Sequence, residues 1–560
     1  MAVPQWWQEA VCYQVYPRSF ADSNRDGIGD IGGVIGKLDY LQWLGVTALW
    51  VSPFYPSAQV DWGYDISDYT AVDPEYGTLE DVQQLIEAAH GRGIRVLLDL
   101  VLNHTSDQHA WFRASRSGLE NPYRDWYIWR EGKNGGPPND WESIFGGSAW
   151  TLDPQTGQYY YHFFFPEQPD LNWRNPAVKE AIFAAMRFWL ERGVDGFRLD
   201  AIGSLFEAKD LADSDTPGSL EAMFIKARRG VFEDWQTLQA KTRHQMNQPE
   251  IHATLREMRA LADEYPDCVL LGETEDVSFY GRGHDELHSV FNFELIERLD
   301  AAHYRKVLTD RLPRVPEGAW ESNTVGNHDR RRSYTFCGDG MHDDLRARLA
   351  LAVTMFLRGT PVFYYGEEIG MRQRSPETLE AMRDTFGTRF YRILRERYGA
   401  GHPEALEVAA QYMGRDGCRT PMQWSNAPNA GFSVAGVETW LPVNPDHAEG
   451  VNVEDQREQP DSMLTFFRGL VVLRRTHPAL SRGRMRVLAD TGALLGFWRE
   501  WEGERMLLVF NMSGRAQAFQ LPPGLEAVYG PPPEGDVVLR LAPYGFFIGR
   551  PGRLEPSVVG

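Results

Sequence analysis

The sequence is poor in cysteine and contains no long apolar run. Its four cysteines, at positions 12, 268, 337 and 418, lie far apart and form no CxxC pair. A disulfide framework or a zinc site of paired cysteines is therefore not expected. No stretch comes near the roughly 18 uninterrupted apolar residues of a membrane-spanning helix. The first residues lack the basic flank and apolar run of a signal peptide, so we expect a cytoplasmic protein without a membrane partner.

The sequence has fewer basic than acidic residues. Lys and Arg total 57 against 78 Asp and Glu, which gives a formal net charge of −21 at pH 7. Proteins that bind nucleic acids need clustered cations against the phosphates, so we expect no nucleic-acid partner. The composition, 42% hydrophobic and 24% charged, is that of a globular protein. A chain of 560 residues is longer than one hydrophobic core normally accommodates, so we expect a large domain with one or two smaller ones.

Short apolar runs that stop at polar or charged residues recur eight times. Amphipathic helical stretches such as Leu79–Arg92 and Val178–Arg192 separate most of them. This alternation predicts parallel βα units, and eight units favour a closed (β/α)8 TIM barrel over an open doubly wound sheet. The runs are Val11–Pro17, Val46–Pro53, Ile94–Val101, Asp195–Ile202, Cys268–Glu273, Ser289–Glu294, Asn323–Asp329 and Pro361–Glu367.

Some intervals are too long for simple crossovers. The stretch after the third run is rich in Trp, Tyr, Gly and Pro and predicts a small inserted domain. The interval Gly203–Asp267 is longer than one helix requires. Near the C-terminus, short alternating strands with turns predict an antiparallel β-sandwich. The expected division is barrel at 1–105 and 174–484, with a helical loop segment at 370–460, inserted domain at 106–173, and β domain at 485–560.

Four of the predicted strands end on ionisable side chains. The third ends Asp99-Leu-Val-Leu-Asn-His104, the fourth Gly196-Phe-Arg-Leu-Asp200, the fifth Leu271-Gly-Glu273 and the seventh Gly326-Asn-His-Asp329. Catalytic groups of such barrels come from these strand ends. One buried carboxylate would suit a structural ion pair, but three, with two histidines and an arginine beside them, are too costly to bury for structure alone. We therefore expect an active site here.

These strand ends belong to a set of motifs by which the chain resembles glycoside hydrolase family 13, the α-amylase family. The similarity is closest to its bacterial α-glucosidase and oligo-1,6-glucosidase branch and covers nearly the whole chain. The motifs are Tyr13–Phe20, Asp61–Asp65, Asp99–His104, Gln168–Asn172, Gly196–Asp200, Gly272-Glu273, Asn327–Asp329, Gly366–Gly370 and Gly414–Trp424.

The resemblance implies a retaining double displacement. Asp200 would be the nucleophile, Glu273 the general acid and base, and Asp329 the group that stabilises the transition state. Arg198 lies two residues before Asp200, on the same face of the strand. A nearby cation lowers the pKa of a carboxyl group, so we expect Arg198 to keep Asp200 ionised.

The resemblance also implies a binding pocket for the terminal glucose. His104 and His328 would donate hydrogen bonds to its hydroxyls, and Tyr64 would stack on its ring. Asp61 and Arg415 would pair and close the far end, so that cleavage releases one glucose at a time.

Three further residues have two readings each. Phe145 and Phe164 either line the pocket or belong to the ordinary core. Asp99 either takes part in the site or, as we expect, is structural and positions Asn103 and His104.

Two positions bear on the leaving-group side. Ala201 follows the predicted nucleophile; among similar enzymes valine here accompanies α-1,6 cleavage, and alanine or threonine α-1,4. This favours maltose and malto-oligosaccharides as substrates. After Asp329 the chain reads Arg330-Arg-Arg332, where relatives usually carry Gln-Pro-Arg, so the subsite beyond the scissile bond differs from theirs.

A run of oxygen-bearing residues near the N-terminus has the spacing of a calcium loop. Ligands would occupy positions 1, 3, 5 and 9, with a glycine at position 6 and a backbone carbonyl at position 7. The bidentate glutamate at position 12 is missing, because Gly33 stands there. A structural Ca2+ (or Mg2+) is expected, as the resemblance also implies, and no organic cofactor. The ligands would be Asp22, Asn24, Asp26, Ile28 and Asp30.

Several alternatives stay open or are disfavoured. Some proteins of this family are non-catalytic transporter subunits, but those need a membrane helix and usually lack the carboxylates. A sugar-binding module would need neither Asp200 nor Glu273. Among enzymes, a sucrose hydrolase or isomerase, an oligo-1,6-glucosidase, a trehalose-cleaving enzyme and an α-glucosyl transferase share the machinery. The partners implied are small α-glucosides, and the oligomeric state is open.

Overall fold

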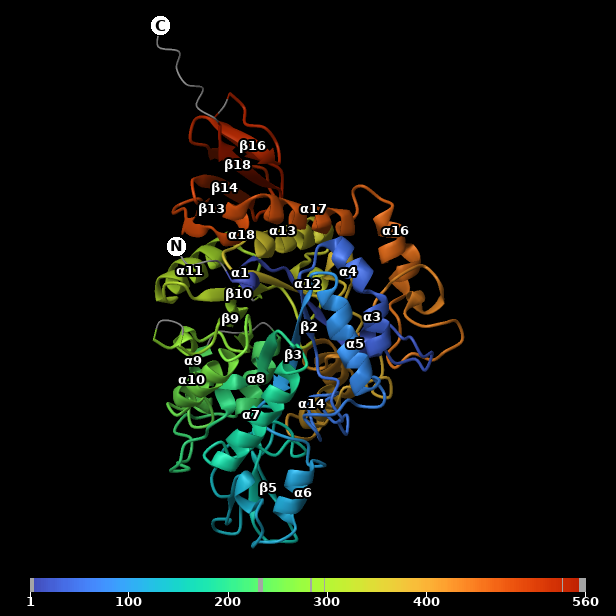
Figure 1. Cartoon of the computed structure of the whole chain (residues 1–560), viewed down its shortest axis with the longest axis vertical. Coiled ribbons are helices and arrows are strands. Elements are labelled where there is room, and N and C mark those ends of the chain that lie inside the picture. Colours follow the sequence, from blue (N-terminus) through green and yellow to red (C-terminus); the bar gives the residue numbers. More distant parts are fainter. Residues whose placement is uncertain (1–4, 230–234, 283–284, 297, 536, 553–560) are drawn as a thin grey trace.

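The computed structural model describes residues 5–229, 235–282, 285–296, 298–535 and 537–552. Its centre is a closed barrel of eight parallel strands, in the order β1-β11-β10-β9-β8-β7-β3-β2 (Figure 1). This confirms the predicted (β/α)8 fold. The strands are β1 (Cys12–Val15), β2 (Ala48–Val51), β3 (Arg95–Val101), β7 (Gly196–Asp200), β8 (Val269–Gly272), β9 (Ser289–Asn292), β10 (Trp320–Thr324) and β11 (Thr360–Tyr364).

Side chains alternate between two apolar layers along these strands, as the period of two requires. One layer fills the barrel and includes Trp50, Leu97 and Phe291. The other packs outward under the surrounding helices and is continuous with their buried faces. The helices include α3 (Ile31–Gly36), α4 (Leu38–Leu44), α5 (Leu79–His90), α7 (Pro176–Leu190), α10 (Ile251–Ala262), α11 (Ala301–Arg311), α13 (Asp343–Phe356) and α17 (Met463–Thr476).

Three excursions from the barrel lie beyond the C-terminal ends of its strands. The first, between β3 and α7, contains α6 (Ala110–Arg116) and the antiparallel sheet of β4 (Trp129–Arg130), β6 (Tyr159–Tyr161) and β5 (Trp150–Leu152). The second, between β7 and α10, contains α8 (Leu220–Arg228) and α9 (Trp235–Thr242). The third, after β11, contains α14 (Thr385–Glu396), α15 (His402–Val408) and the π-helical turn Ala409–Met413.

One apolar cluster joins all three excursions. Phe165 comes from the first, Ile225 of α8 from the second, and Phe386 and Phe390 of α14 from the third. The excursions therefore form one packed wall beside the barrel mouth.

The C-terminal residues form two antiparallel sheets, β12-β13-β14-β18-β16 and β15-β17, at one end of the molecule (Figure 1). Buried residues of both sheets share a core, so they pack as a sandwich. The bounds are β12 (Arg484–Val487), β13 (Leu494–Trp501), β14 (Glu504–Asn511), β15 (Gln517–Gln520), β16 (Leu525–Tyr529), β17 (Val538–Leu541) and β18 (Phe546–Pro551).

The seventh barrel strand corrects the sequence-based prediction. It spans Trp320–Thr324 and not Asn323–Asp329, so Asp329 lies on the loop beyond the strand. The strand is buried although its residues are mostly polar. Glu321, for example, accepts a hydrogen bond from Nε of Arg311 at 2.5 Å. Because a buried carboxylate is paired in this way, the strand lacks the apolar pattern by which buried strands are predicted.

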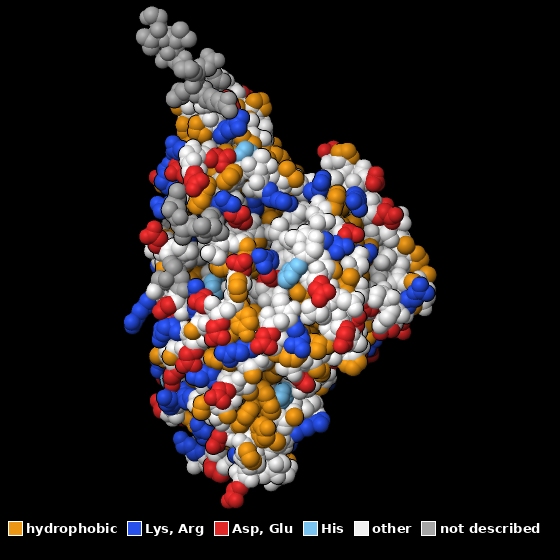
Figure 2. All heavy atoms as spheres, in the orientation of Figure 1, with side chains coloured by type: hydrophobic (Ala, Val, Ile, Leu, Met, Phe, Trp, Pro, Cys, Tyr) orange, Lys and Arg blue, Asp and Glu red, His pale blue; other side chains and the backbone are white. Residues whose placement is uncertain are grey.

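Charges of both signs are interspersed among the coloured side chains on the face shown in Figure 2. Among the described residues, no helix has the length and apolar character needed to cross a membrane.

Gly196 should be required for the strand that carries the active-site residues. Its φ is +149°, and an added Cβ would lie 2.1 Å from the carbonyl oxygen of Val269 on β8. Gly196→Ala should therefore push β7 away from β8 and lower the Tm by several degrees. The matched control is Gly36→Ala, because nothing lies within 4 Å of the added atom. Equal Tm values for the two variants would contradict this prediction.

Candidate active site

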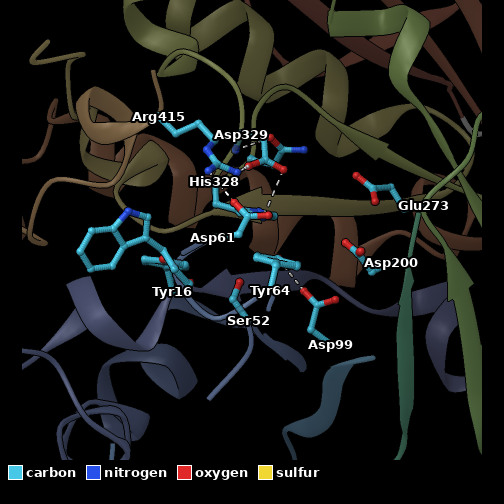
Figure 3. Close-up of polar contacts among 12 residues, drawn as sticks. Tyr16, Ser52, Asp61, Tyr64, Asp99, Asp200, Glu273, His328, Asp329 and Arg415 are labelled. Atoms are coloured by element: carbon cyan, nitrogen blue, oxygen red, sulfur yellow. Dashed lines mark hydrogen bonds and ion pairs between the residues drawn. The ribbon is translucent and has the colours of Figure 1, made fainter. Parts of the chain in front are cut away.

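Two carboxylates face one another from neighbouring strands (Figure 3). Asp200 ends β7, and Glu273 directly follows β8. The guanidinium of Arg198 joins them, with Nη1 2.6 Å from Oδ1 of Asp200 and Nη2 2.9 Å from Oε2 of Glu273. Nη1 also lies 2.7 Å from Oδ1 of Asp99 on β3. The guanidinium of Arg198 therefore contacts three carboxyl groups.

This shortage of positive charge limits how far Arg198 can lower the pKa of Asp200. Burial raises the pKa of Asp200 well above its ordinary value, and the charges of Glu273 and Asp99 raise it further. Arg198 acts in the expected direction but does not outweigh them. Asp200 therefore holds a proton more tightly than an ordinary aspartate, and acid should inactivate the proposed nucleophile at a higher pH.

Asp99 belongs to this cluster, and the expected role for it is wrong. Its Oδ2 accepts hydrogen bonds from Oη of Tyr64 at 2.9 Å and from Nε1 of Trp50 at 3.1 Å. The partners of its side chain are thus Arg198, Tyr64 and Trp50, and not Asn103 or His104. Burial raises its pKa to about 6. Asp99 orients Arg198 and Tyr64 at the same time.

Asp329 lies on the opposite side of the site and has a different environment (Figure 3). Its Oδ1 is 2.8 Å from Nη2 of Arg419 and 3.5 Å from Nη1 of Arg415. Burial opposes its charge, but the guanidinium groups of Arg419 and Arg415 outweigh burial and hold its pKa below the ordinary range. Asp329 is therefore ionised wherever the protein is folded at ordinary pH, as a group that stabilises positive charge must be.

The far end of the site is closed by a buried ion-pair network. Arg415 and Asp61 pair as expected, with Nη2 2.6 Å from Oδ1. Asp384 adds a two-point contact to Arg415, at 2.7 and 3.0 Å, and Gln168 donates to Oδ2 of Asp61 at 2.9 Å. Asp61, Asp384 and Arg415 are all buried, so three charged side chains pack together at this end of the site.

Two neutral histidines flank the network. Burial lowers the pKa of His104 to about 3 and that of His328 well below its ordinary value. Nδ1 of His328 contacts Nε2 of Gln14 at 2.8 Å, which assigns the proton to Nε2. That buried Nε2 lies 3.2 Å from Oδ2 of Asp329 but makes no well-aligned hydrogen bond within the described chain, so the two residues present a donor and an acceptor side by side. The ring of Tyr64 stacks on His328, with centroids 5.1 Å apart.

Phe145 and Phe164 are both half-buried, and their rings lie 5.2 Å apart in edge-to-face contact. Phe164 is also 5.1 Å from His104, which places it beside the pocket. Phe145 instead contacts Phe386 at 4.6 Å and joins the packed wall.

Ala201 has an unusual backbone conformation. It is left-handed, with φ 45° and ψ 37°, a region that residues with a Cβ seldom occupy. Its N–H donates to Oε2 of Glu273 at 3.0 Å. The turn after the nucleophile therefore also positions the second carboxylate.

Sequence reasoning missed some members of the site. Arg419 and Gln168 lie within quoted motifs but received no role. Asp384 precedes α14 in a region without a recognisable pattern, and only its contact with Arg415 reveals it.

In the predicted metal loop, the carboxylate oxygens accept hydrogen bonds from backbone N–H groups of the same loop. Asp22 accepts the N–H groups of Arg25 and Gly27, at 2.6 and 2.9 Å. Asp30 caps α3 by accepting from Gly33 at 2.6 Å. Among the described residues there is no group of three or more His, Cys, Asp or Glu side chains that could hold a metal ion. The loop does not fit a preformed cage, so the calcium site, with Asn24, Asp26 and Ile28, stays a prediction.

Paired carboxylates on one cation, with a third held ionised across the pocket, define a glycoside hydrolase. Residues 14–483 match the family described as alpha amylase, catalytic domain, and the chain belongs to this family.

Its relatives bear different names. The chain is 40% identical to an oligo-1,6-glucosidase of Parageobacillus thermoglucosidasius, over 92% of each chain. It is 41% identical to a probable alpha-glucosidase of Rhizobium meliloti, over 92% of this chain and 91% of that one. Among solved structures, an alpha-glucosyl transfer enzyme is 38% identical with a TM-score of 0.86. Trehalulose synthase of Pseudomonas mesoacidophila MX-45 is 36% identical with a TM-score of 0.88; both comparisons cover 98% of this chain and 100% of the other.

Removal of divalent metal tests the loop. If the ion binds, its ligands must exchange amide partners for the cation, and the folded state gains stability from the bound ion. Chelator should then lower the Tm, added Ca2+ should restore it, and activity at moderate temperature should change less. Asp26→Asn should weaken the response. A Tm that responds to neither chelator nor Ca2+ would reduce the loop to a turn.

Proposed function

We propose that this glycoside hydrolase is a retaining α-glucosidase that releases glucose from the non-reducing end of short α-glucosides. The observation that carries the proposal is the Asp200–Arg198–Glu273 bridge. A single guanidinium keeps the two carboxylates close together, as double displacement requires, whereas an inverting pair needs room for a water between them.

The geometry supports the following chemistry. The carboxylate of Asp200 attacks the anomeric carbon, the glycosidic bond breaks, and the leaving oxygen takes the proton of Glu273. Glu273, now a carboxylate, removes a proton from water, whose oxygen attacks the same carbon and frees Asp200. Two inversions retain the configuration. Asp329 stabilises the positive charge that develops on the sugar in each step.

The closed end of the pocket supports release of one glucose at a time. The Asp61–Arg415–Asp384 network presents charged oxygens and nitrogens to the end of the pocket, where the hydroxyls of a terminal sugar would lie. Neutral His104 and His328 add hydrogen-bond partners, and Tyr64 adds a flat apolar face.

For the linkage, we propose a preference for α-1,4 over α-1,6 bonds. The support is the small side chain of Ala201, which is adjacent to both Asp200 and Glu273. A larger side chain here would change the space open to the second sugar, since its backbone is fixed by the hydrogen bond to Glu273.

Asp200→Asn should lower kcat by at least about a thousandfold, because an amide cannot form the glucosyl ester. The Tm should stay the same or rise, since the change removes one of three carboxylates around one guanidinium. Asp39→Asn, whose side chain is 82% exposed, is the control and should keep full activity. NMR of the first product should show the α anomer. Substantial residual turnover, or a β-anomeric product, would exclude double displacement through Asp200.

Ala201→Val should shift the ratio of kcat/KM for isomaltose over maltose upward by about tenfold, since pocket changes of this size are worth about 1–3 kcal/mol. Ala201→Thr is the matched control because it imposes the same branched shape on the left-handed backbone. A shift in both variants indicates bulk, and a shift with valine alone indicates apolar character. A wild type that prefers isomaltose, or a ratio unchanged in both variants, would refute the linkage proposal.

A further inference from the structure

The catalytic dipeptide His328-Asp329 lies beyond the end of β10, so no neighbouring strand satisfies its carbonyl groups. Buried backbone carbonyls need a donor, and here each receives one from an arginine. Nε of Arg419 lies 2.9 Å from the carbonyl oxygen of His328. Nη1 of Arg228 lies 2.9 Å from that of Asp329. Two guanidinium groups thus supply the hydrogen-bond donors that a neighbouring strand would otherwise provide.

Arg228 also holds a second part of the site. Its Nε donates to the carbonyl of Tyr412 at 2.8 Å, and its Nη2 to that of Met413 at 3.4 Å. These carbonyls end the π-helical turn Ala409–Met413, one residue before Gly414-Arg415. Such turns are energetically poor and are often found at functional sites. One side chain therefore joins the loop of Asp329 to the segment that presents Arg415.

The same two segments meet through a second contact. The guanidinium of Arg331 lies over the ring of Tyr412, 5.5 Å from its centroid. The position of Asp329 thus depends on how the π-helical turn is held.

Arg228 reaches this place from the long excursion between β7 and α10, where it is the last residue of α8. The helix is anchored at its other end by Glu221, whose Oε2 is 2.8 Å from Nη1 of Arg397. Ile225 of α8 packs in the apolar cluster with Phe386 and Phe390. Arg228 is therefore presented by a fixed helix and not by a free loop.

Its environment is unusual for an arginine. Within the described part of the chain Arg228 has no ion-pair partner, and its side chain donates its hydrogen bonds to backbone carbonyl groups. Burial lowers its pKa to about 10, and the charge of Arg330 adds to the effect.

We propose that Arg228 is a positioning residue for the glycosidic reaction, which fixes the backbone of Asp329 against the segment of Arg415. The inference rests on the proposed role of Asp329 in the transition state. It assigns a purpose to the excursion between β7 and α10: α8 completes the active site from outside the barrel. Arg228 contacts Asp329 directly but reaches Arg415 only through the carbonyls of Tyr412 and Met413, so turnover should be affected more than ground-state binding.

The test compares Arg228→Ala, Arg228→Gln and Arg228→Lys with Lys226→Ala, an exposed residue on the same helix. Kinetics use 4-nitrophenyl α-glucoside, and amide hydrogen exchange is followed in residues 326–330 and 409–415. The alanine and glutamine variants should lose about 10- to 100-fold in kcat with little change in KM, and exchange should increase in both segments. Lysine should restore part of kcat, because its ammonium can reach only some of the carbonyls. Lys226→Ala should match the wild type.

Two results would overturn the proposal. One is a loss of kcat without faster exchange in either segment, which would give Arg228 another role. The other is faster exchange with unchanged kcat, which would make the contact merely structural. Failure of the proposed substrate preference is visible separately, in the ratio of maltose to isomaltose turnover by the wild type.

Discussion

The active site depends on one guanidinium shared among three carboxylates. Arg198 contacts Asp99, Asp200 and Glu273 within 2.6–2.9 Å, and each of these side chains in turn constrains a different part of the site. Asp99 orients Tyr64, and Glu273 accepts the N–H of the turn at Ala201. Because one guanidinium cannot balance the charge of three carboxyl groups, the cluster favours the approach of further positive charge, such as that of the oxocarbenium-like transition state in the proposed reaction.

A second group of charges, on the opposite side, has the reverse balance. Arg415 and Arg419 surround Asp329, and Asp61 and Asp384 complete the pairing of Arg415. The two groups give similar aspartates opposite behaviour: the pKa of Asp200 is raised and that of Asp329 is lowered. The difference arises from the number of guanidinium groups per carboxylate, since both side chains lie in the same pocket.

The barrel could be predicted from the sequence, and so could the grouping of the candidate catalytic residues at one end of it, because apolar runs, strand-end carboxylates and family motifs are local signals. What could not be predicted depends on contacts between distant segments. Asp384 joins the site through its contact with Arg415, 31 residues later. Arg228 carries no motif, and its bonds span 101 and 184 residues. The bounds of β10 were missed because a buried Glu321 reads as a surface residue until Arg311 is placed beside it.

The apolar cluster shared by the three excursions has a consequence for modularity. Phe165, Ile225 and Phe386 come from insertions after three different strands but interlock in one core. A segment transplanted alone from a relative with another substrate would meet two unmatched neighbours and leave voids or clashes. We therefore expect the three excursions to change together in evolution. Chimeras should likewise be built by exchanging all three at once.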